Sequence, residues 1–394
     1  MRKRGTLSAL LKNTLRLPTV AGETFTDIRT APSIPLGQII TTVCLMPLLE
    51  VKSLLRLDFY ARFKQVKRLF GAVAEDSRPI CSDSTLQRVL RWLDESETGR
   101  LLTAFVPEMR RRAADRYQLV PNGPTRLIAV GDGSVMGKHH VCAFALVSNV
   151  MSVPFMIEGT PGHGHELKTA SAMIARIPDV LGRANTPDLL LYDYLGFNAS
   201  VFHAARSAGM HLLVKGGESE FRELLNDARA LFREPREATF QTSGWQFDLH
   251  RLWRWHIEET SDTFAGYPVR VVRLLEQPVK NPEAPPQSSW IVTTDFSLTH
   301  QELREAAHVR WSIENNVFKR LSSLVATKRF HFNEQRPFVA LLRIVCAALS
   351  AFDLAIYIMN GHKRGCKQLL GPVKWTYAIV YQTLFYSLED NTFA

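Results

Sequence analysis

The chain has 394 residues, of which 46% are hydrophobic and 22% charged, a composition typical of folded globular proteins. This length exceeds what one ordinary hydrophobic core accommodates, so we expect two or three structural units. The formal net charge of +10 favours a polyanionic partner, nucleic acid before membrane. Residues 1–124 hold much of the excess, with 20 Lys and Arg against 12 Asp and Glu. A basic surface without a specific partner is the alternative that charge leaves open.

The cysteines and the apolar segments indicate the compartment. Five scattered cysteines without a CxxC pair predict neither a disulfide framework nor a cysteine zinc site, and they favour a reducing, cytoplasmic location. The apolar segment 39–49 is too short to cross a bilayer, and the segment 339–359 is interrupted by Arg343 and Asp353. We therefore expect two buried helices and no membrane association.

The first 124 residues are expected to form a helical DNA-binding region that ends at the breaker Pro121–Pro124. Within it, Ser82–Thr85 offers an N-cap for a short helix over 86–93, which exposes Arg88 and Arg91. A capped basic helix suits a DNA groove. A plain packing helix agrees with the pattern equally well.

Strand-like segments follow the breaker. Runs rich in Val, Ile, Leu and Phe lie at 126–130, 141–147, 153–157, 189–192 and 211–214, with helical stretches at 166–177 and 197–207. This order predicts a mixed α/β sheet with an antiparallel start. Alternating segments between 238 and 294 predict an all-β insertion, and the helical pattern resumes at Thr299.

Two of these strands are expected to end in an aspartate. Asp132 follows the apolar run 127–130, and Asp193 follows the apolar run 189–192. Taken alone, Asp132 suits a hairpin turn with Gly133, and Asp193 suits an N-cap for the next helix. If the two strands are parallel neighbours, however, both carboxylates lie within reach of one pair of metal ions, which are typically ~4 Å apart.

A third carboxylate lies on the expected helix around Glu314. Arg310 and Glu314 are four residues apart, so one continuous helix would place them on the same face as Val317 and Leu321. A carboxylate on an apolar face needs a cation or a metal ion beside it. Two strand-end aspartates and this glutamate are the ligands that a two-metal phosphoryl-transfer site requires.

In this arrangement the chain resembles the DDE transposases of bacterial insertion sequences, family four, the group of the Tn-five transposase. The resemblance runs from Ile128 to Phe330. It comprises an Asp-Gly-Ser strand end, the turn Gly162-His163-Gly164-His165-Glu166-Leu167, a Leu-Leu-Leu-Tyr-Asp strand and an Arg-Trp-x-Ile-Glu helix.

The resemblance implies a ribonuclease-H-like catalytic core with an all-β insertion, flanked by an N-terminal helical domain and C-terminal helices. The expected regions are 1–124 (helical, DNA-binding), 125–216 (first part of the core), 217–297 (mainly β insertion), 298–335 (second part of the core, with the catalytic glutamate helix) and 336–394 (C-terminal helices). The separation of 121 residues between Asp193 and Glu314 leaves room for the insertion.

The resemblance also implies a function. Asp132, Asp193 and Glu314 would bind two Mg²⁺ ions, for which Mn²⁺ can substitute. The activity would be cleavage of double-stranded DNA at terminal inverted repeats and strand transfer into target DNA, with no ATP motif required. The enzyme would act in the cytoplasm, on the nucleoid, as a homodimer in the end-paired complex.

The family signature around the glutamate is only partly present. Arg310 and Glu314 match it, whereas its Tyr position is Ala307 and its Lys position is Leu321. Candidate DNA-backbone contacts are Arg310, Lys319, Arg320, Lys328, Arg329, Lys215, Arg88 and Arg91. In relatives an aromatic residue of the insertion stacks on a flipped base, and the tryptophans here are Trp245, Trp253, Trp255 and Trp290.

Two other sites and two other functions compete with this hypothesis. His163, His165 and Glu166 carry zinc-ligand chemistry without the spacing of a helical zinc site. Asp295 is the rival third carboxylate, disfavoured because no cation stands beside it in the sequence as Arg310 stands beside Glu314. A decayed or domesticated DNA-binding protein, or a metal-dependent nuclease, is the alternative function.

Overall fold

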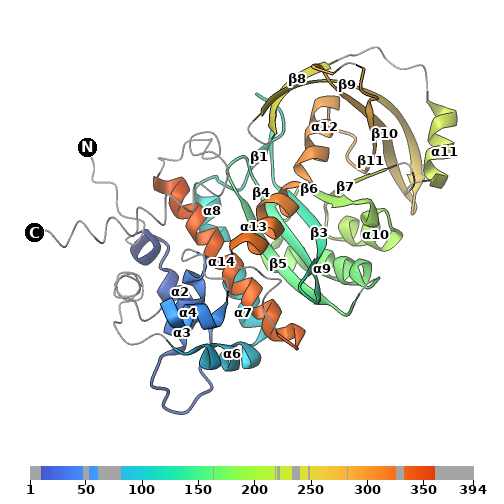
Figure 1. The fold of residues 1–394 in the computed structure, drawn as a ribbon. Coiled ribbons are helices and arrows are strands. Elements are labelled where there is room, and N and C mark those ends of the chain that lie inside the picture. Colours follow the sequence, from blue (N-terminus) through green and yellow to red (C-terminus); the bar gives the residue numbers. More distant parts are fainter. Residues whose placement is uncertain are drawn as a thin grey trace, which may run out of the picture. The chain divides into compact units, whose positions relative to one another are not determined.

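A computed structural model of the chain describes residues 10–47, 53–60, 81–162, 164–217, 219, 222–232, 240–246, 249–281, 283–324 and 332–359 (Figure 1). The chain forms two compact units, each made of separate segments. Unit 1 contains 1–115, 133–163 and 314–394, and unit 2 contains 116–132 and 164–313. Strand β3 (Ile128–Met136) passes from unit 2 into unit 1 directly after Asp132.

Unit 1 is mostly helical. Its elements are η1 (Leu10–Thr14), α2 (Leu17–Thr24), α3 (Leu36–Leu45), α4 (Leu54–Tyr60), α6 (Asp83–Trp92), α7 (Glu95–Thr103), α8 (Val106–Arg111), β4 (His139–Val147), β5 (Ser152–Thr160), η4 (Glu314–Phe318), α13 (Lys319–Leu324) and α14 (Gln335–Met359). Strand β4 pairs antiparallel with β5 and lies beside the end of β3.

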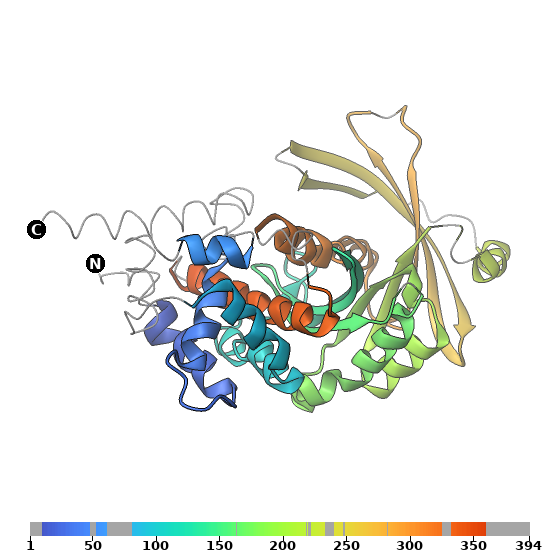
Figure 2. The same cartoon turned by 60° about the horizontal axis from the view of Figure 1, so that its bottom comes forward.

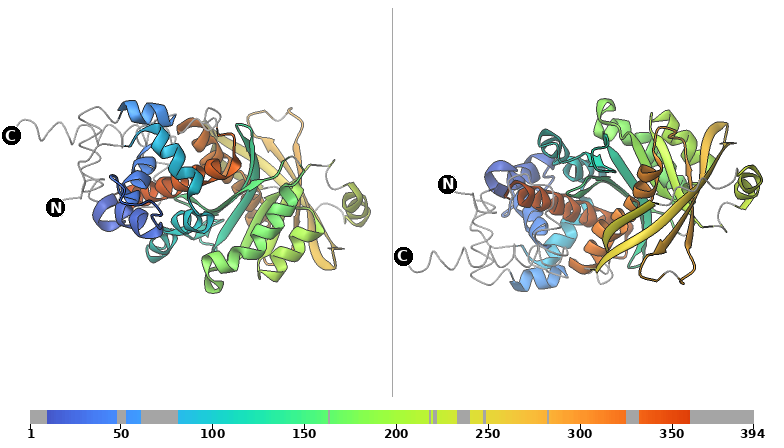
Figure 3. Two further views of the ribbon diagram at one scale, coloured as in Figure 1. Left: turned by 90° about the horizontal axis from the view of Figure 1, so that it is seen from below. Right: turned by 90° about the horizontal axis from the view of Figure 1, so that it is seen from above.

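Helix α14 is the core of unit 1, and the N-terminal helices pack around it (Figure 3). Among the described residues it is the one helix long and apolar enough to cross a membrane, yet 94% of its most apolar window is buried inside the protein. The predicted buried helix is therefore confirmed. Its buried Arg343 donates from Nε to the Ile157 carbonyl and from Nη1 to the Glu95 carbonyl and the Thr98 hydroxyl, so the guanidinium joins α14 to β5 and α7.

Unit 2 contains a sheet with helices on it. Its elements are β1 (Tyr117–Gln118), β2 (Thr125–Arg126), the first part of β3, α9 (Glu166–Leu181), η2 (Arg183–Asn185), β6 (Leu189–Asp193), η3 (Tyr194–Gly196), α10 (Ala199–Ser207), β7 (His211–Gly216), α11 (Arg222–Leu231), β8 (Phe240–Gln246), β9 (Leu249–Phe264), β10 (Tyr267–Pro278), β11 (Gln287–Thr293) and α12 (His300–Val309). The strand order is β3-β6-β7-β11-β10-β9-β8.

The strands of unit 2 run in two directions. Strands β3, β6 and β7 are parallel, and β11, β10, β9 and β8 continue the sheet in antiparallel steps. Helices α9 and α10 lie side by side (Figure 2), and α10 packs against β7. Helix α12 lies inside the curve of β8–β11 (Figure 1) and also packs against β6 and β7. The mixed α/β fold predicted from the sequence is confirmed at this level.

One expectation for β3 is wrong. Asp132 and Gly133 do not form a hairpin turn, because β3 continues to Met136 and the turn falls at Gly137-Lys138. Gly137 has φ 65°, a left-handed conformation that glycine adopts without steric cost. Asp132 is therefore held inside a strand.

The Arg343 contacts yield a stability prediction. We expect Arg343→Met to lower the free energy of unfolding of the folded protein by about 3 kcal/mol, because buried carbonyls lose a charged donor. The exposed Arg336 of the same helix donates one bond to the Leu93 carbonyl, so Arg336→Met should cost below about 1 kcal/mol. Urea unfolding of both variants measures the difference, and equal losses would contradict it.

Candidate active site of unit 2

Parallel pairing aligns the two predicted aspartates. In the register of β3 and β6, Ile128 faces Leu189 and Val130 faces Leu191, an offset of 61 residues. The same offset separates Asp132 from Asp193. Both aspartates therefore lie at the same level, two residues beyond the last of these pairs and towards the carboxyl ends of neighbouring strands.

Side-chain alternation fixes the face on which Asp193 lies. The Tyr192 hydroxyl is 3.2 Å from Glu166 Oε1, and Glu166 is the first residue of α9, so Tyr192 points to the α9 face of the sheet. Successive strand residues point to opposite faces, so Asp193 points away from α9. Asp193 Oδ1 also accepts a hydrogen bond from the Leu195 backbone N–H at 3.1 Å and so caps the short turn η3, whereas the helix for which a cap was predicted, α10, is capped by Asn198.

Lys215 lies beside Asp193 on β7, at the paired position of the register. Because paired residues of adjacent strands share a face, Lys215 also lies on the face of the sheet that points away from α9. Burial lowers the pKa of its ammonium group, Glu276 raises it in part, and the charges of Arg310 and Arg304 lower it further. The net result is a pKa below the ordinary lysine value.

Two of these neighbours, Glu276 of β10 and Arg304 of α12, form a polar cluster with His308 of α12. The Glu276 carboxylate accepts from Arg304 Nε at 2.8 Å and contacts His308 Nε2 at 3.0 Å. Burial raises the Glu276 pKa, but the hydrogen bond and charge of His308 and the charges of Arg304 and Lys215 outweigh it and leave the pKa below its ordinary value. The carboxylate is therefore anionic at neutral pH.

Arg310 is the C-cap of α12 and is buried. Its guanidinium carbon lies 4.2 Å from the centroid of the exposed Trp311 ring, close enough for a cation–π contact. Within the described residues, its buried Nε has no hydrogen-bond partner. Lys215 is thus surrounded by the positive charges of Arg304 and Arg310 and by the negative charge of Glu276.

The expected continuous helix from Arg310 to Leu321 is wrong. Helix α12 ends at Val309, and the Trp311 N–H bonds to the His308 carbonyl, which tightens the last turn. The next segment, η4, is a π-helix that begins at Glu314, so its residues do not keep the α-helical spacing. Arg310 and Glu314 also belong to different units.

Glu314 has a cation partner within unit 1. Its Oε1 lies 3.6 Å from Lys319 Nζ, and its side chain is 35% exposed. Within unit 1, the charge of Glu314 is thus balanced by Lys319. Convergence of Glu314 with the two aspartates of unit 2 stays a prediction.

The other predicted contacts occupy different environments. Arg88 and Arg91 are exposed on α6, where the Ser82 side chain caps the helix as predicted. Arg320 is buried and its guanidinium makes two hydrogen bonds to the Asp353 carboxylate, at 2.6 and 2.7 Å. Lys328 and Arg329, and His163 of the zinc alternative, lie outside the described residues.

Burial separates the tryptophans of the insertion. Trp255 and Trp290 have exposed fractions of 2% and 0%, so neither presents a face to a flipped base. Trp253 is half-buried, and the side chain of Trp245 lies outside the described part of the chain.

Asp295 lies at the opposite end of the parallel strands. Thr293 of β11 faces Leu213 of β7, and the Thr294 backbone N–H bonds to the Leu212 carbonyl, whereas Asp193 faces Lys215 further along β7. Asp295, two residues beyond Thr293, is thus directed to the amino-terminal end of β7. The topology of unit 2 therefore removes Asp295 as a partner of Asp132 and Asp193.

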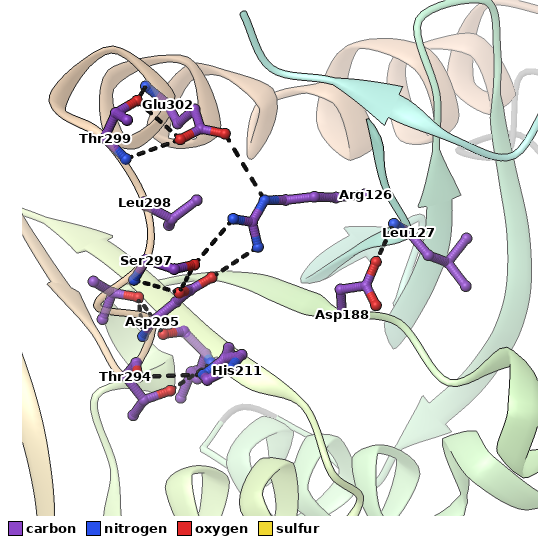
Figure 4. A network of polar contacts seen from close by, with 12 residues as sticks. Arg126, Leu127, Asp188, His211, Thr294, Asp295, Ser297, Leu298, Thr299 and Glu302 are labelled. Atoms are coloured by element: carbon purple, nitrogen blue, oxygen red, sulfur yellow. Dashed lines mark hydrogen bonds and ion pairs between the residues drawn. The ribbon is translucent and has the colours of Figure 1, made fainter. Parts of the chain in front are cut away.

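The premise that Asp295 lacks a cation is also wrong, because its partner comes from a distant part of the sequence. Asp295 Oδ2 lies 3.0 Å from Arg126 Nη1, and Asp295 Oδ1 accepts from the Ser297 N–H and hydroxyl (Figure 4). Arg126 Nε lies 3.9 Å from Glu302 Oε1, and Glu302 forms a capping box with Thr299 at the start of α12. These contacts secure the first turn of α12.

The two aspartates have the ligand chemistry of a Mg²⁺ site, but the structure shows no third ligand beside them among the described residues. Asp132 and Asp193 supply carboxylate oxygens, the ligands that Mg²⁺ prefers. Among the described residues, no group of three or more His, Cys, Asp or Glu side chains is close enough to hold a metal ion. Comparison with protein-family models and with curated proteins finds no match to this chain.

The Asp295 contacts predict a purely structural role. Asp295→Asn should lower the free energy of unfolding by about 2–3 kcal/mol, because the half-buried Arg126 loses its closest anion. Ser297→Ala removes the hydroxyl contacts with Asp295 and Arg126 but keeps the ion pair between them, so it should cost less, about 1 kcal/mol. Urea unfolding distinguishes the two, and an unchanged Asp295→Asn midpoint would refute the role.

Proposed function

We propose that the protein is a DDE-type DNA transposase that cleaves double-stranded DNA at the ends of its element and joins the freed 3′ ends to target DNA. The observation that carries the proposal is the register of β3 and β6, which brings Asp132 and Asp193 to the same level of adjacent parallel strands. The sequence resemblance assigns the catalytic role to these two residues and to Glu314.

The strand arrangement supports a ribonuclease-H-like core. In chain order, the antiparallel pair β4 and β5 follows β3, and β6 and β7 then return parallel to β3. Between β7 and α12 the chain forms the antiparallel strands β8–β11, in the interval where the family has its all-β insertion. Residues of this interval, such as Glu276, contribute directly to the surroundings of Lys215.

In the proposed mechanism the carboxylates of Asp132 and Asp193 would hold Mg²⁺, and Glu314 is the third proposed ligand. The bound ions would activate the attacking water or 3′ hydroxyl and stabilise the leaving oxygen. The Leu195 N–H donates to Oδ1 of Asp193 and so helps to fix the orientation of the carboxylate. Lys215 and Arg310 supply positive charge for the phosphate of the scissile strand.

The proposed partners are double-stranded DNA and a second copy of the chain. The surplus of basic residues suits double-stranded DNA, and the homodimer of the end-paired complex rests on the resemblance alone. Terminal inverted repeats flanking the gene would mark the DNA as the natural substrate. Such flanking DNA is therefore the substrate with which cleavage and strand transfer should be measured.

Catalysis is tested with Asp193→Asn. We expect this change to abolish Mg²⁺-dependent cleavage of the flanking DNA while binding stays equal or becomes tighter, because negative charge near phosphate is removed. Asp295→Asn is the matched control, since it makes the same chemical change at the other end of the strands and should retain cleavage. Gel analysis of cleaved ends and strand-transfer products measures both steps, and cleavage by Asp193→Asn would remove the catalytic assignment.

The same assay separates the alternative functions. Cleavage without joined products identifies a nuclease, and binding without cleavage by the wild-type protein identifies a DNA-binding protein that lacks catalysis.

The exposed arginines of α6 are tested through salt dependence. Replacing Arg88 and Arg91 by Ala should weaken binding to DNA and reduce the slope of log K against log salt by about one unit per lost phosphate contact. Arg100, exposed on the neighbouring α7, is the control because its guanidinium lies 3.8 Å from Glu97. An unchanged slope in the double variant would show that α6 is a packing helix.

A further inference from the structure

Two carboxylates from the antiparallel strands contact α12, one at each end of the helix. Glu259 of β9 contacts His300, the first residue of α12, at 3.1 Å and also bonds to Arg270. Glu276 of β10 contacts His308, in the last turn, and bonds to Arg304. Each carboxylate thus holds one histidine and one arginine, and the strands fix α12 through the same chemistry at both ends.

The two contacts differ in burial and in surrounding charge. The Glu276 side chain is 7% exposed and that of Glu259 is 33% exposed. Arg304 and His308 are four residues apart on one helix face, and Arg304 also lies over the Trp255 ring at 5.6 Å. Arg304 and Lys215 both act on Glu276, and Arg310 acts in turn on Lys215. Within the described part of the chain, the charged groups that act on Glu259 are Arg270 and His300.

Glu276 is the anion that keeps these cations close together. Partly buried like charges repel strongly because water no longer screens them. Without the carboxylate, Lys215 and Arg310 would relax outward, and the last turn of α12 would lose its bond to β10. Lys215 is the residue paired with Asp193, so any displacement there changes the charge that faces the candidate active site.

We propose that Glu276 is a positioning residue, which acts through Arg304 and His308 to set the end of α12 and to hold Arg310 and Lys215 on the side of the sheet where Asp193 lies. This proposal rests on the proposed transposase function for its catalytic consequence. Its structural part, the fixing of the last turn of α12, is independent of that function. Glu276 itself is not proposed to contact DNA or metal.

Glu276→Gln tests the proposal because it keeps the size of the side chain and an oxygen acceptor but removes the charge. Hydrogen exchange of the DNA-free, full-length protein reads the structural part. We expect faster exchange of the backbone amides of residues 304–310 in Glu276→Gln. In the matched control Glu259→Gln, faster exchange should be confined to the first turn of α12, near His300.

Cleavage of flanking DNA reads the catalytic part. Glu276→Gln should reduce kcat at least about tenfold, the equivalent of 1.4 kcal/mol, while KM stays equal or falls because uncompensated cations attract phosphate. Glu259→Gln should retain wild-type kcat. Since Glu276 acts through Arg304, adding Arg304→Met to Glu276→Gln should cost less than the sum of the two single effects.

The outcomes separate the two proposals. Unchanged exchange at 304–310 overturns the positioning role, whether or not the protein cleaves DNA. If Glu276→Gln exchanges faster but keeps the wild-type kcat, the positioning role is also overturned. The transposase proposal still holds in that case, because the wild-type protein cleaves DNA. If Glu276→Gln exchanges faster but the wild-type protein does not cleave DNA, the structural part is supported and the transposase function is refuted. If Glu276→Gln fails to fold, His308→Gln, at a half-exposed position, gives the same exchange and kcat readouts.

Discussion

Parallel hydrogen bonding of β3, β6 and β7 is the constraint on which the candidate site depends. It converts a separation of 61 residues into adjacency, because this register brings residues 61 positions apart to the same level of two neighbouring strands. The interior positions of β6 are apolar on both faces, from Leu189 to Tyr192, so a shift in register would cost packing on both sides at once. The hydrophobic core therefore sets where Asp193 lies.

Helix α12 links this sheet edge to the antiparallel strands. Its first turn is held by the capping box of Thr299 and Glu302 and by Arg126, and its last turn by the Glu276 carboxylate. A helix held at both ends can fix the position of a residue at its terminus. Arg310 occupies that terminus, which explains how its guanidinium stays in place although its buried Nε has no hydrogen-bond partner among the residues that the structure describes.

Local patterns in the sequence predicted the elements better than their partners. The alternation and apolar runs located β4 to β7 and the Ser82 cap, because these depend on neighbours a few residues away. The ion pair of Arg126 with Asp295 joins residues 169 positions apart, and no local pattern signals it. The sequence does not reveal the end of α12 at Val309, because residues with helical spacing continue in the sequence beyond this point.

The charge balance of the buried groups distinguishes the candidate site from ordinary structural ion pairs. Arg320 meets the carboxylate of Asp353, and Arg126 meets those of Asp295 and Glu302, so each cation is neutralised within the protein. Around Lys215, by contrast, the three cations Lys215, Arg304 and Arg310 are accompanied by two carboxylates, Glu276 and the paired Asp193. Such a surplus is unfavourable in a partly buried setting unless an outside anion completes it. A DNA phosphate beside Asp193 would supply that anion, and in return the surplus would offset the repulsion between phosphate and the two aspartates.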